Sequence, residues 1–242
     1  PKMWHSVFVL AFLSVSFVLP AQKTLKLGNE ALVKEQFSQA INYFEAQINK
    51  EKNNQKLVAE LSYKIAYCYK RLSIPEMSAP YFQKAVENGC EEELLYLYYG
   101  ESLQMLQFYD SALVQFQKFE RLHPEHSLSQ KGLQSIELTQ QALASPTRYE
   151  VTLKPIINSG GEDYCPFYEA RTHKKLYFTS TRNAQTHVTI NPESGEYCSN
   201  IFVAELDREG KWSEAKILPG NINSTDEEGA ACLHRKSNNL YF

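Results

Sequence analysis

Small residues and phenylalanine recur at a fixed spacing three times in the first half of the chain. In each copy a second small residue follows the first after 12 positions, and a phenylalanine follows 4 positions later. The three copies are Gly28, Ala40, Phe44; Ala66, Ser78, Phe82; and Gly100, Ala112, Phe116. Because small residues let two helices approach closely while an aromatic ring fills the space beside them, this spacing predicts a stack of antiparallel helix pairs.

The same stretch resembles tetratricopeptide repeats, whose period is about 34 residues. The step from Ala66 to Gly100 matches this period, and the step from Gly28 to Ala66 is slightly longer. The residues that carry the resemblance are Leu27, Gly28, Phe37, Ala40, Phe44, Ile65, Ala66, Tyr69, Phe82, Ala85, Tyr99, Gly100, Leu103, Tyr109, Ala112, Phe116 and Pro124. The resemblance implies an α-solenoid, which we assign to residues 22–145.

The sequence departs from the family pattern at a few positions. An aromatic residue is expected four positions before the first small residue, but Thr24 and Ser62 stand there in the first two copies, and only the third has one, Tyr96. Pro75 and Pro80 fall near the second helix of the middle pair. Since proline lacks an amide donor and clashes with the preceding turn, we expect that helix to start late or to kink.

The segment that follows the last copy, residues 127–144, carries apolar side chains among Gln, Ser and Glu. The apolar positions are Leu128, Leu133, Ile136, Leu138 and Leu143. We expect a terminal helix or helix pair that shields the last repeat from water.

The resemblance also implies a concave groove, lined by the first helix of each pair, that accepts a peptide or a partner surface. By the family pattern the side chains that face this groove are Asn29, Leu32, Tyr63, Tyr67, Lys70, Leu97, Glu101 and Gln104. The alternative is that these side chains pack against the second half of the chain or simply face water.

The composition changes beyond Pro146, from Ala, Leu, Gln, Glu and Lys to Gly, Asn, Ser, Thr and paired aromatic residues. Short runs with period-two alternation are separated there by turn clusters, which predicts a meander of antiparallel strands over residues 146–242. The runs 176–180 and 200–204 are apolar on both faces, as expected for strands between stacked sheets. The fold class is therefore multidomain, α-helical first and β second.

The β half also repeats itself. Asn158-Ser159 recurs as Asn223-Ser224, and Leu176-Tyr177-Phe178 recurs as Leu240-Tyr241-Phe242, at nearly the same offset along the chain. With the later Asn200-Ile201-Phe202-Val203 and Trp212-Ser213, these landmarks resemble the WD-like β-propeller repeats of the Tol-system periplasmic type, although Thr172-His173-Lys174 replaces the usual Asp-Gly turn. Because propellers close with about four to eight blades, we expect residues 146–242 to supply only the first blade or blades of a truncated propeller.

The beginning of the chain predicts export. Residues 6–19 form an uncharged apolar run that ends before Pro20-Ala21-Gln22. The run is shorter than the roughly 20 residues that a bilayer crossing requires, so we interpret residues 1–21 as a cleaved signal peptide that leaves no transmembrane span. An uncleaved anchor is the alternative.

The order of signal peptide, tetratricopeptide array and propeller resembles envelope proteins of Gram-negative bacteria related to the outer-membrane-protein-A family, some of which serve type IX secretion. The resemblance implies a location in the periplasm or on the periplasmic face of the outer membrane. It implies other envelope proteins or peptides as partners, and peptidoglycan through a C-terminal domain that this sequence does not contain.

Charge and cysteine usage exclude several classes of ligand. The net charge of −3 comes from 25 basic and 28 acidic residues without long blocks, so no nucleic-acid footprint is present. Three of the five cysteines, Cys165, Cys198 and Cys232, lie in the β half, where one disulfide can form among them. The sequence contains no Cys-x-x-Cys or Cys-x-x-His pair, so it does not indicate a zinc site.

No sequence signature of catalysis or of cofactor binding is present. His123-Pro124-Glu125-His126 is interpreted as a solvated loop at the end of a repeat, and Asp226-Glu227-Glu228 as an exposed turn. We therefore expect a protein-binding scaffold rather than an enzyme, with no cofactor and no metal. The alternatives are a propeller hydrolase whose catalytic residues lie downstream of residue 242, and a glycan-binding sensor.

Overall fold

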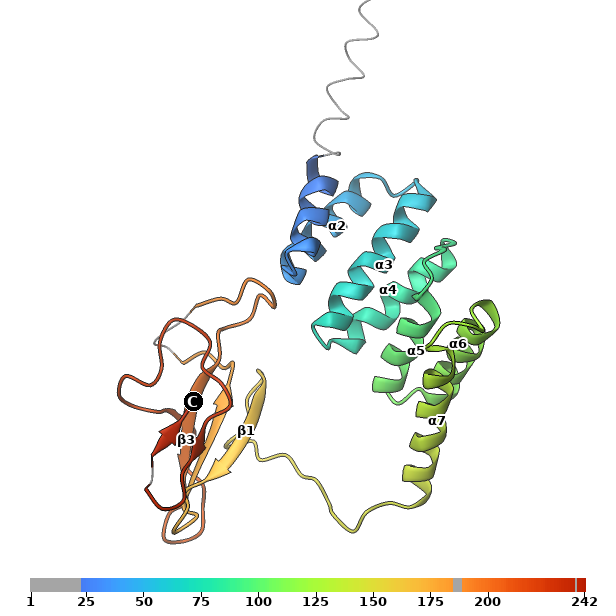
Figure 1. Cartoon of the computed structure of the whole chain (residues 1–242). Coiled ribbons are helices and arrows are strands. Elements are labelled where there is room, and N and C mark those ends of the chain that lie inside the picture. The colour runs from blue at the N-terminus through green and yellow to red at the C-terminus, as the bar shows by residue number, and fades with distance from the viewer. Residues whose placement is uncertain (1–22, 185–188, 238) are drawn as a thin grey trace, which may run out of the picture. The chain divides into compact units, whose positions relative to one another are not determined.

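The computed structural model describes residues 23–184, 189–237 and 239–242. It contains two compact units, which meet in the sequence between Thr147 and Arg148 (Figure 1). The first unit is helical and the second is built from β-strands. The predicted signal peptide, residues 1–21, lies outside the described residues.

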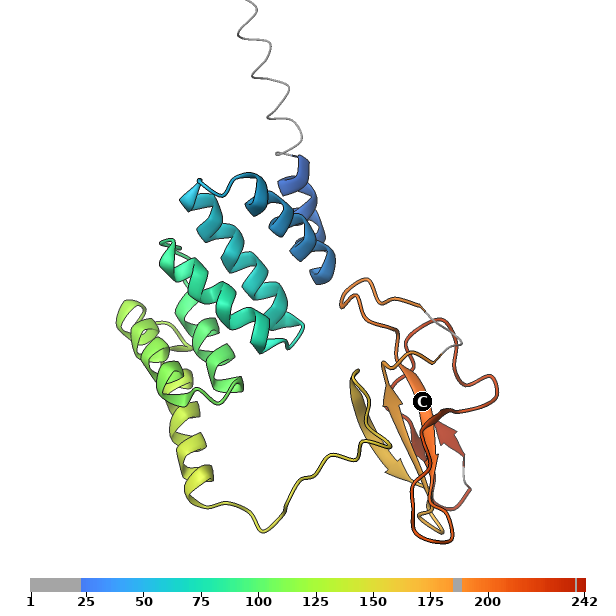
Figure 2. The same ribbon diagram turned by 180° about the vertical axis from the view of Figure 1, so that it is seen from behind.

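The helical unit is a series of helices that pack in chain order (Figures 1 and 2). After the helical residues 23–33 come α2 (Phe37–Lys50), α3 (Gln55–Arg71), α4 (Pro75–Glu87), α5 (Leu95–Met105), α6 (Tyr109–Leu122) and α7 (Ser129–Ala144). Residues 23–33 pair with α2, α3 with α4, and α5 with α6. The unit therefore has the three helix pairs that the spacing predicts, which is the tetratricopeptide arrangement.

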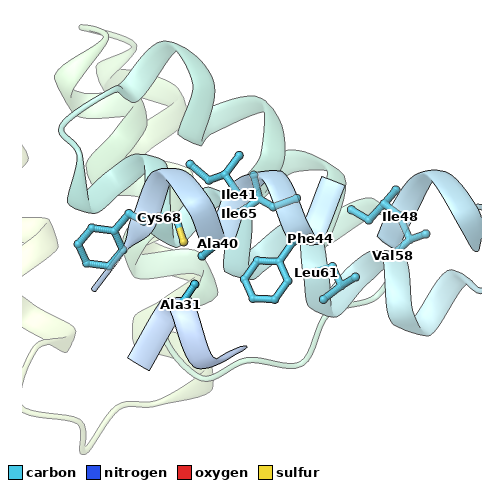
Figure 3. Close-up of a cluster of buried hydrophobic side chains, with 10 residues drawn as sticks. Ala31, Ala40, Ile41, Phe44, Ile48, Val58, Leu61, Ile65 and Cys68 are labelled. Atoms are coloured by element: carbon cyan, nitrogen blue, oxygen red, sulfur yellow. The ribbon is translucent and has the colours of Figure 1, made fainter. Parts of the chain in front are cut away.

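The small residues of the repeat stand where two helices meet. A Cβ atom at Gly28 would lie 2.6 Å from Phe44 Cε1, and a Cβ atom at Gly100 would lie 2.6 Å from Phe116 Cε1. Neither position can hold a larger side chain unless the phenylalanine ring or the helices shift. Figure 3 shows the resulting core, in which Phe44 and Ala40 of α2 are fully buried beside Leu61 and Ile65 of α3.

The turn inside each helix pair repeats in its backbone as well. Glu35, Ser73 and Gln107 have positive φ angles of 58°, 57° and 64°, and they follow one another at the same steps as Gly28, Ala66 and Gly100. The amide of the residue after each one donates to the carbonyl five positions earlier, as in a Schellman motif. The repeat is thus visible in local backbone geometry as well as in packing.

The prediction that prolines would delay the second helix of the middle pair is wrong. The step from the start of α2 at Phe37 to the start of α4 at Pro75 equals the step from Gly28 to Ala66, so α4 begins where the repeat requires. Proline is tolerated in the first helical turn, because no amide there donates to an intrahelical partner. Pro80 lies within α4 and is exposed.

A single helix, α7, follows the last pair. Ile136 is buried and Leu128 and Leu133 pack against the core, but Leu138 and Leu143 are 64% and 60% exposed. The expectation that all five apolar positions shield the repeat therefore holds only for the first part of this helix.

The β unit contains a four-stranded antiparallel meander, β1 (Asp163–Tyr168), β2 (Lys175–Ser180), β3 (Asn200–Glu205) and β4 (Lys216–Ile217), in that order across the sheet. A second sheet pairs β5 (Cys232–Leu233) with β6 (Leu240–Tyr241). Phe178, Phe202, Ala204 and Ile157 form the buried core of the unit.

The second sheet repeats the pairing of β1 with β2. Phe167 stands opposite Tyr177 in the first copy, and Cys232 stands opposite Tyr241 in the second. A positive φ angle recurs at equivalent positions of the two copies, at 49° for Cys165, where the register of β1 shifts, and at 48° for Ala230. The sequence repeat is thus a repeat of backbone structure, although the described residues form one full sheet and the start of another and not a closed ring.

All five cysteines are free thiols. Cys198 is buried, and Cys165 and Cys232 are exposed on separate sheets.

Candidate protein-binding face

The first helices of successive pairs lie next to one another: α3 contacts α5, and α5 contacts α7. Together with residues 23–33 they form a surface that we call the first-helix face. The predicted groove residues all lie on these helices, with Asn29 and Leu32 on residues 23–33, Tyr63, Tyr67 and Lys70 on α3, and Leu97, Glu101 and Gln104 on α5.

Polar contacts bridge the first junction of this face. Lys64 Nζ donates to Asn29 Oδ1 at 3.0 Å and forms an ion pair with Glu60 at 2.7 Å. The ammonium group is thereby held between two first helices. Lys64 was missed by the sequence analysis, although its position one helical turn after Glu60 is typical of a helical ion pair.

The second junction carries charge and aromatic rings. Lys70 Nζ forms an ion pair with Glu101 at 2.9 Å and lies 4.5 Å from the centre of the Tyr98 ring. The Tyr67 ring is 5.9 Å from the Tyr98 ring, and the Tyr67 hydroxyl accepts a hydrogen bond from Arg71 at 3.1 Å. Since Lys70 is only 24% exposed at its side chain, its cation–π contact is partly shielded from water.

The third junction is made by Gln104. Its side-chain amide donates to Thr139 Oγ1 at 3.1 Å, and its Oε1 accepts from Ser135 Oγ at 3.0 Å, both on α7. Asn29, Lys70 with Glu101, and Gln104 thus connect four consecutive first helices. The side chains that these contacts fix present hydrogen-bond donors and acceptors along one face. Because they are already ordered, they lose less entropy when a partner binds than long, free side chains would.

Two of the predicted residues are used mainly for packing inside the helical unit. Leu97 is only 2% exposed and belongs to the core cluster with Phe116 and Ile136. Tyr63 packs edge-on against Phe82, with 6.0 Å between ring centres, and burial raises the pKa of its hydroxyl. Leu32 is partly buried against the core of the first pair.

A cavity of about 240 Å³ opens where α5 meets α7. Its walls include Leu97, Glu101, Gln104, Phe116, Lys131 and Ser135. Apolar carbon from Leu97 and Phe116 lies beside the carboxylate of Glu101, the amide of Gln104 and the ammonium of Lys131. This arrangement can hold one partner side chain with an apolar stem and a polar end.

Among the described residues, no group of His, Cys, Asp or Glu side chains could hold a metal ion. In the same part of the chain no helix has both the length and the apolar character that a membrane crossing needs. His123 and His126 both pack against Phe119, the first with a tilted ring and the second edge-on, with 5.3 Å between ring centres in each case, so they belong to the packing at the end of α6.

No protein-family model matches the chain, and no curated protein matches it. Solved structures that are similar include the TPR domain of Arabidopsis OM64 (18% identity, 49% of this chain and 95% of that one, TM-score 0.44). The first TPR domain of human RPAP3 (22%, 52% and 93%, TM-score 0.43) is another, as is the TPR2B domain of yeast Sti1 in complex with pHsp70 (16%, 51% and 98%, TM-score 0.42). Each match covers about half of this chain.

Proposed function

We propose that this protein is a non-enzymatic scaffold whose first-helix face binds a peptide or a surface segment of another protein. One observation carries the proposal: polar side chains on that face, Asn29, Lys70, Glu101 and Gln104, are fixed by contacts that run from one first helix to the next. Partly exposed groups that are already ordered lose little entropy on binding, and this favours recognition of a partner.

The β unit supports the same proposal in a different way. Its second sheet copies the pairing and the positive-φ position of the first, as expected for consecutive blades of a WD-like β-propeller. We infer that residues 146–242 provide the beginning of such a propeller, which would give the scaffold a second binding surface.

As part of this proposal, the protein acts in the periplasm or on the periplasmic face of the outer membrane, and its partners are envelope proteins or peptides. The uncharged apolar run at residues 6–19 supports export. A link to peptidoglycan would require a further domain. Fusing residues 1–30 to a reporter enzyme that is active only after export tests the location, and an inactive reporter would contradict it.

Binding is tested by selecting ligands for the whole chain from a displayed library of random peptides. A selected peptide is then titrated against the wild-type protein, Gln104→Ala and Gln117→Ala. Gln117 is the matched control, because it is the same residue type, exposed on the second helix α6. We expect Gln104→Ala to raise the Kd at least about fivefold, which corresponds to the loss of about one net hydrogen bond, and Gln117→Ala to leave it unchanged.

Two outcomes would count against the first-helix face. If no peptide were selected, the proposal that this protein binds peptides would be contradicted. If Gln104→Ala and Gln117→Ala changed the Kd equally, the binding site would lie elsewhere. A glycan array run in parallel covers the sensor alternative, and a glycan ligand in place of a peptide would favour that alternative.

A further inference from the structure

Glu228 is a buried carboxylate with one oxygen unpaired. The residue is only 8% exposed, although the sequence predicts an exposed turn for Asp226-Glu227-Glu228. Its Oε1 accepts hydrogen bonds from the amide and the hydroxyl of Ser224, the former at 2.9 Å. Its Oε2 is buried and has no hydrogen-bond partner among the described residues. Burying half of a carboxylate without a donor costs free energy, so this oxygen indicates a missing partner.

Asp163 shows what that partner is in the first copy of the repeat. Its Oδ2 accepts from the Ser159 amide at 2.7 Å, and its Oδ1 forms an ion pair with Arg182 Nη2 at 2.5 Å. The pair is well buried, with 10% exposure for the Asp163 side chain and 16% for Arg182. The same guanidinium donates to the Ile157 carbonyl at 2.6 Å and lies 5.0 Å from the ring centres of Phe178 and Phe202.

The two carboxylates occupy the same place in the repeat. The offset from Ser159 to Ser224 equals the offset from Asp163 to Glu228, and both serines donate amide and hydroxyl groups to the acid four positions later. In the first copy, Arg182 stands four positions after Phe178, whose counterpart is Phe242. The counterpart of Arg182 would therefore fall four positions after Phe242.

The surroundings of Glu228 favour a cation with several donors. The neighbouring Glu227 carboxylate accepts hydrogen bonds from Ser199 and Asn191, so a second anion nearby excludes an acidic partner. The Glu228 carbonyl already accepts from Ser199 Oγ at 2.7 Å, and the Glu228 amide donates to the Ser199 carbonyl at 3.0 Å. In the first copy one guanidinium serves a carboxylate, a backbone carbonyl and two aromatic rings at once, which the ammonium group of lysine cannot do.

We propose that Glu228 is a binding site for the guanidinium group of an arginine carried on a strand that continues β6, as Arg182 is held by Asp163 after β2. Each copy of the repeat then carries one buried acid–arginine pair, in which the acid lies at the start of the first strand or before it and the arginine follows the second strand. The pair fixes the register between these two strands, because a shift by one residue would direct the arginine to the opposite face.

The experiment extends the whole chain after Phe242 by Thr-Ser-Thr-Arg, the residues that follow Phe178 in the first copy. A second extension, Thr-Ser-Thr-Gln, has the same length without the guanidinium. Both are combined with Glu228→Gln, which keeps the size of the side chain and removes its charge. Asp226→Asn is the matched control, since it removes one negative charge from an exposed side chain two residues away. Amide hydrogen exchange is measured by mass spectrometry on peptides from residues 224–242.

We expect the arginine extension to slow exchange in this segment about tenfold relative to the glutamine extension, as for other coupled buried charge pairs. Glu228→Gln should abolish that difference, and Asp226→Asn should preserve it. Equal exchange in the two extensions, or a difference that survives Glu228→Gln, would overturn the proposal. Because each comparison is made between chains of equal length, a general effect of lengthening the chain cancels.

Discussion

Gly132 of α7 lies against the ring of Phe116 so closely that a Cβ atom at position 132 would be 2.7 Å from Phe116 Cγ. Gly100 also lies close to the same ring, because it too has no side chain. Phe116 is therefore enclosed by two glycines, one on the first helix of its own pair and one on the helix that follows. It follows that α7 docks as the first helix of a further pair would, although a single helix takes that place.

We predict that Gly132→Ala destabilises the helical unit by about 1–3 kcal/mol, because the added methyl group must displace a buried aromatic ring. The helix propensity of alanine would act in the opposite direction by about 1 kcal/mol, so a net loss identifies the steric effect. Gln134→Ala, at an exposed position of the same helix, is the control and should change little. Urea unfolding followed by far-ultraviolet circular dichroism measures both, and a stabilised Gly132→Ala would show that α7 is not held by this contact.

Gln107 supplies the positive φ angle in the turn between α5 and α6, and its side chain is exposed. Residues other than glycine are strained in the left-handed region by about 1–2 kcal/mol. Glycine relieves this strain but loses more conformational entropy on folding, so the net effect of Gln107→Gly should be a stabilisation of about 0.5–1 kcal/mol. Gln107→Ala removes the same side chain but keeps a Cβ atom, so it should give little change. A thermal unfolding scan of the three proteins compares them, and equal behaviour of the two variants would contradict the backbone explanation.

The helix pairs could be predicted from the sequence because the contacts that define them are local. Gly28, Ala40 and Phe44 act on neighbouring helices, so their spacing carries the information. Gly132 does not complete a fourth copy of the pattern, because Ala144 follows it after 12 positions but Arg148 stands 4 positions later in place of phenylalanine. The sequence does not predict the start of α4 correctly, since proline is unfavourable within a helix but Pro75 stands in the first turn, where it is acceptable.

The contacts of the candidate sites are harder to predict from the sequence than the helix pairs. The eight groove residues could be named from the family pattern, but the partners that fix them, such as Lys64 for Asn29 and Thr139 for Gln104, come from other helices 35 residues away. The sequence predicts an exposed Glu228, because this residue follows two other acidic residues. It is buried because Ser199, which lies 29 residues earlier, binds its backbone.

The Asp163–Arg182 pair should make the β unit sensitive to acid. Burial by itself would raise the pKa of Asp163, but hydrogen bonds from Ser180 and Arg182 outweigh it and hold the pKa below the usual 3.8. A carboxyl group with a depressed pKa in the folded state stabilises the fold above its unfolded pKa, and this contribution is lost as the pH falls through the folded value. The urea midpoint of the β unit should therefore decrease as the pH falls below about 4.

Fluorescence of Trp212 in a Trp4→Phe chain follows this transition, because Trp212 packs against the core of the β unit. Glu227 has a lowered pKa as well, since its hydrogen bonds from Ser199 and Asn191 outweigh the effect of burial, so it contributes in the same direction. Asp163→Asn should lower the midpoint at neutral pH and reduce the acid dependence without abolishing it. An unchanged pH profile in Asp163→Asn would show that the ion pair contributes nothing to stability.

The two asparagines of the β repeat provide a matched pair of positions with different environments. Asn223 is 5% exposed, accepts a hydrogen bond from the Ile201 amide at 2.7 Å, and donates to the carbonyls of Ile201 and Leu218 at 3.2 and 3.0 Å. Asn158 is its counterpart in the first copy, but it is exposed, and its side chain accepts from the Lys154 amide at 3.0 Å. The same residue type therefore stabilises the fold to different extents.

Removing the Asn223 side chain leaves the buried Ile201 amide of β3 without its acceptor, whereas removing that of Asn158 leaves a backbone amide that water can reach. We predict that Asn223→Ala costs about 2–4 kcal/mol of unfolding free energy and Asn158→Ala about 0.5 kcal/mol or less. Urea titration with Trp212 as the probe measures both in the Trp4→Phe chain. If the two variants were equally destabilised, Asn158 would have to bond as Asn223 does, and the first copy of the repeat would be as enclosed as the second.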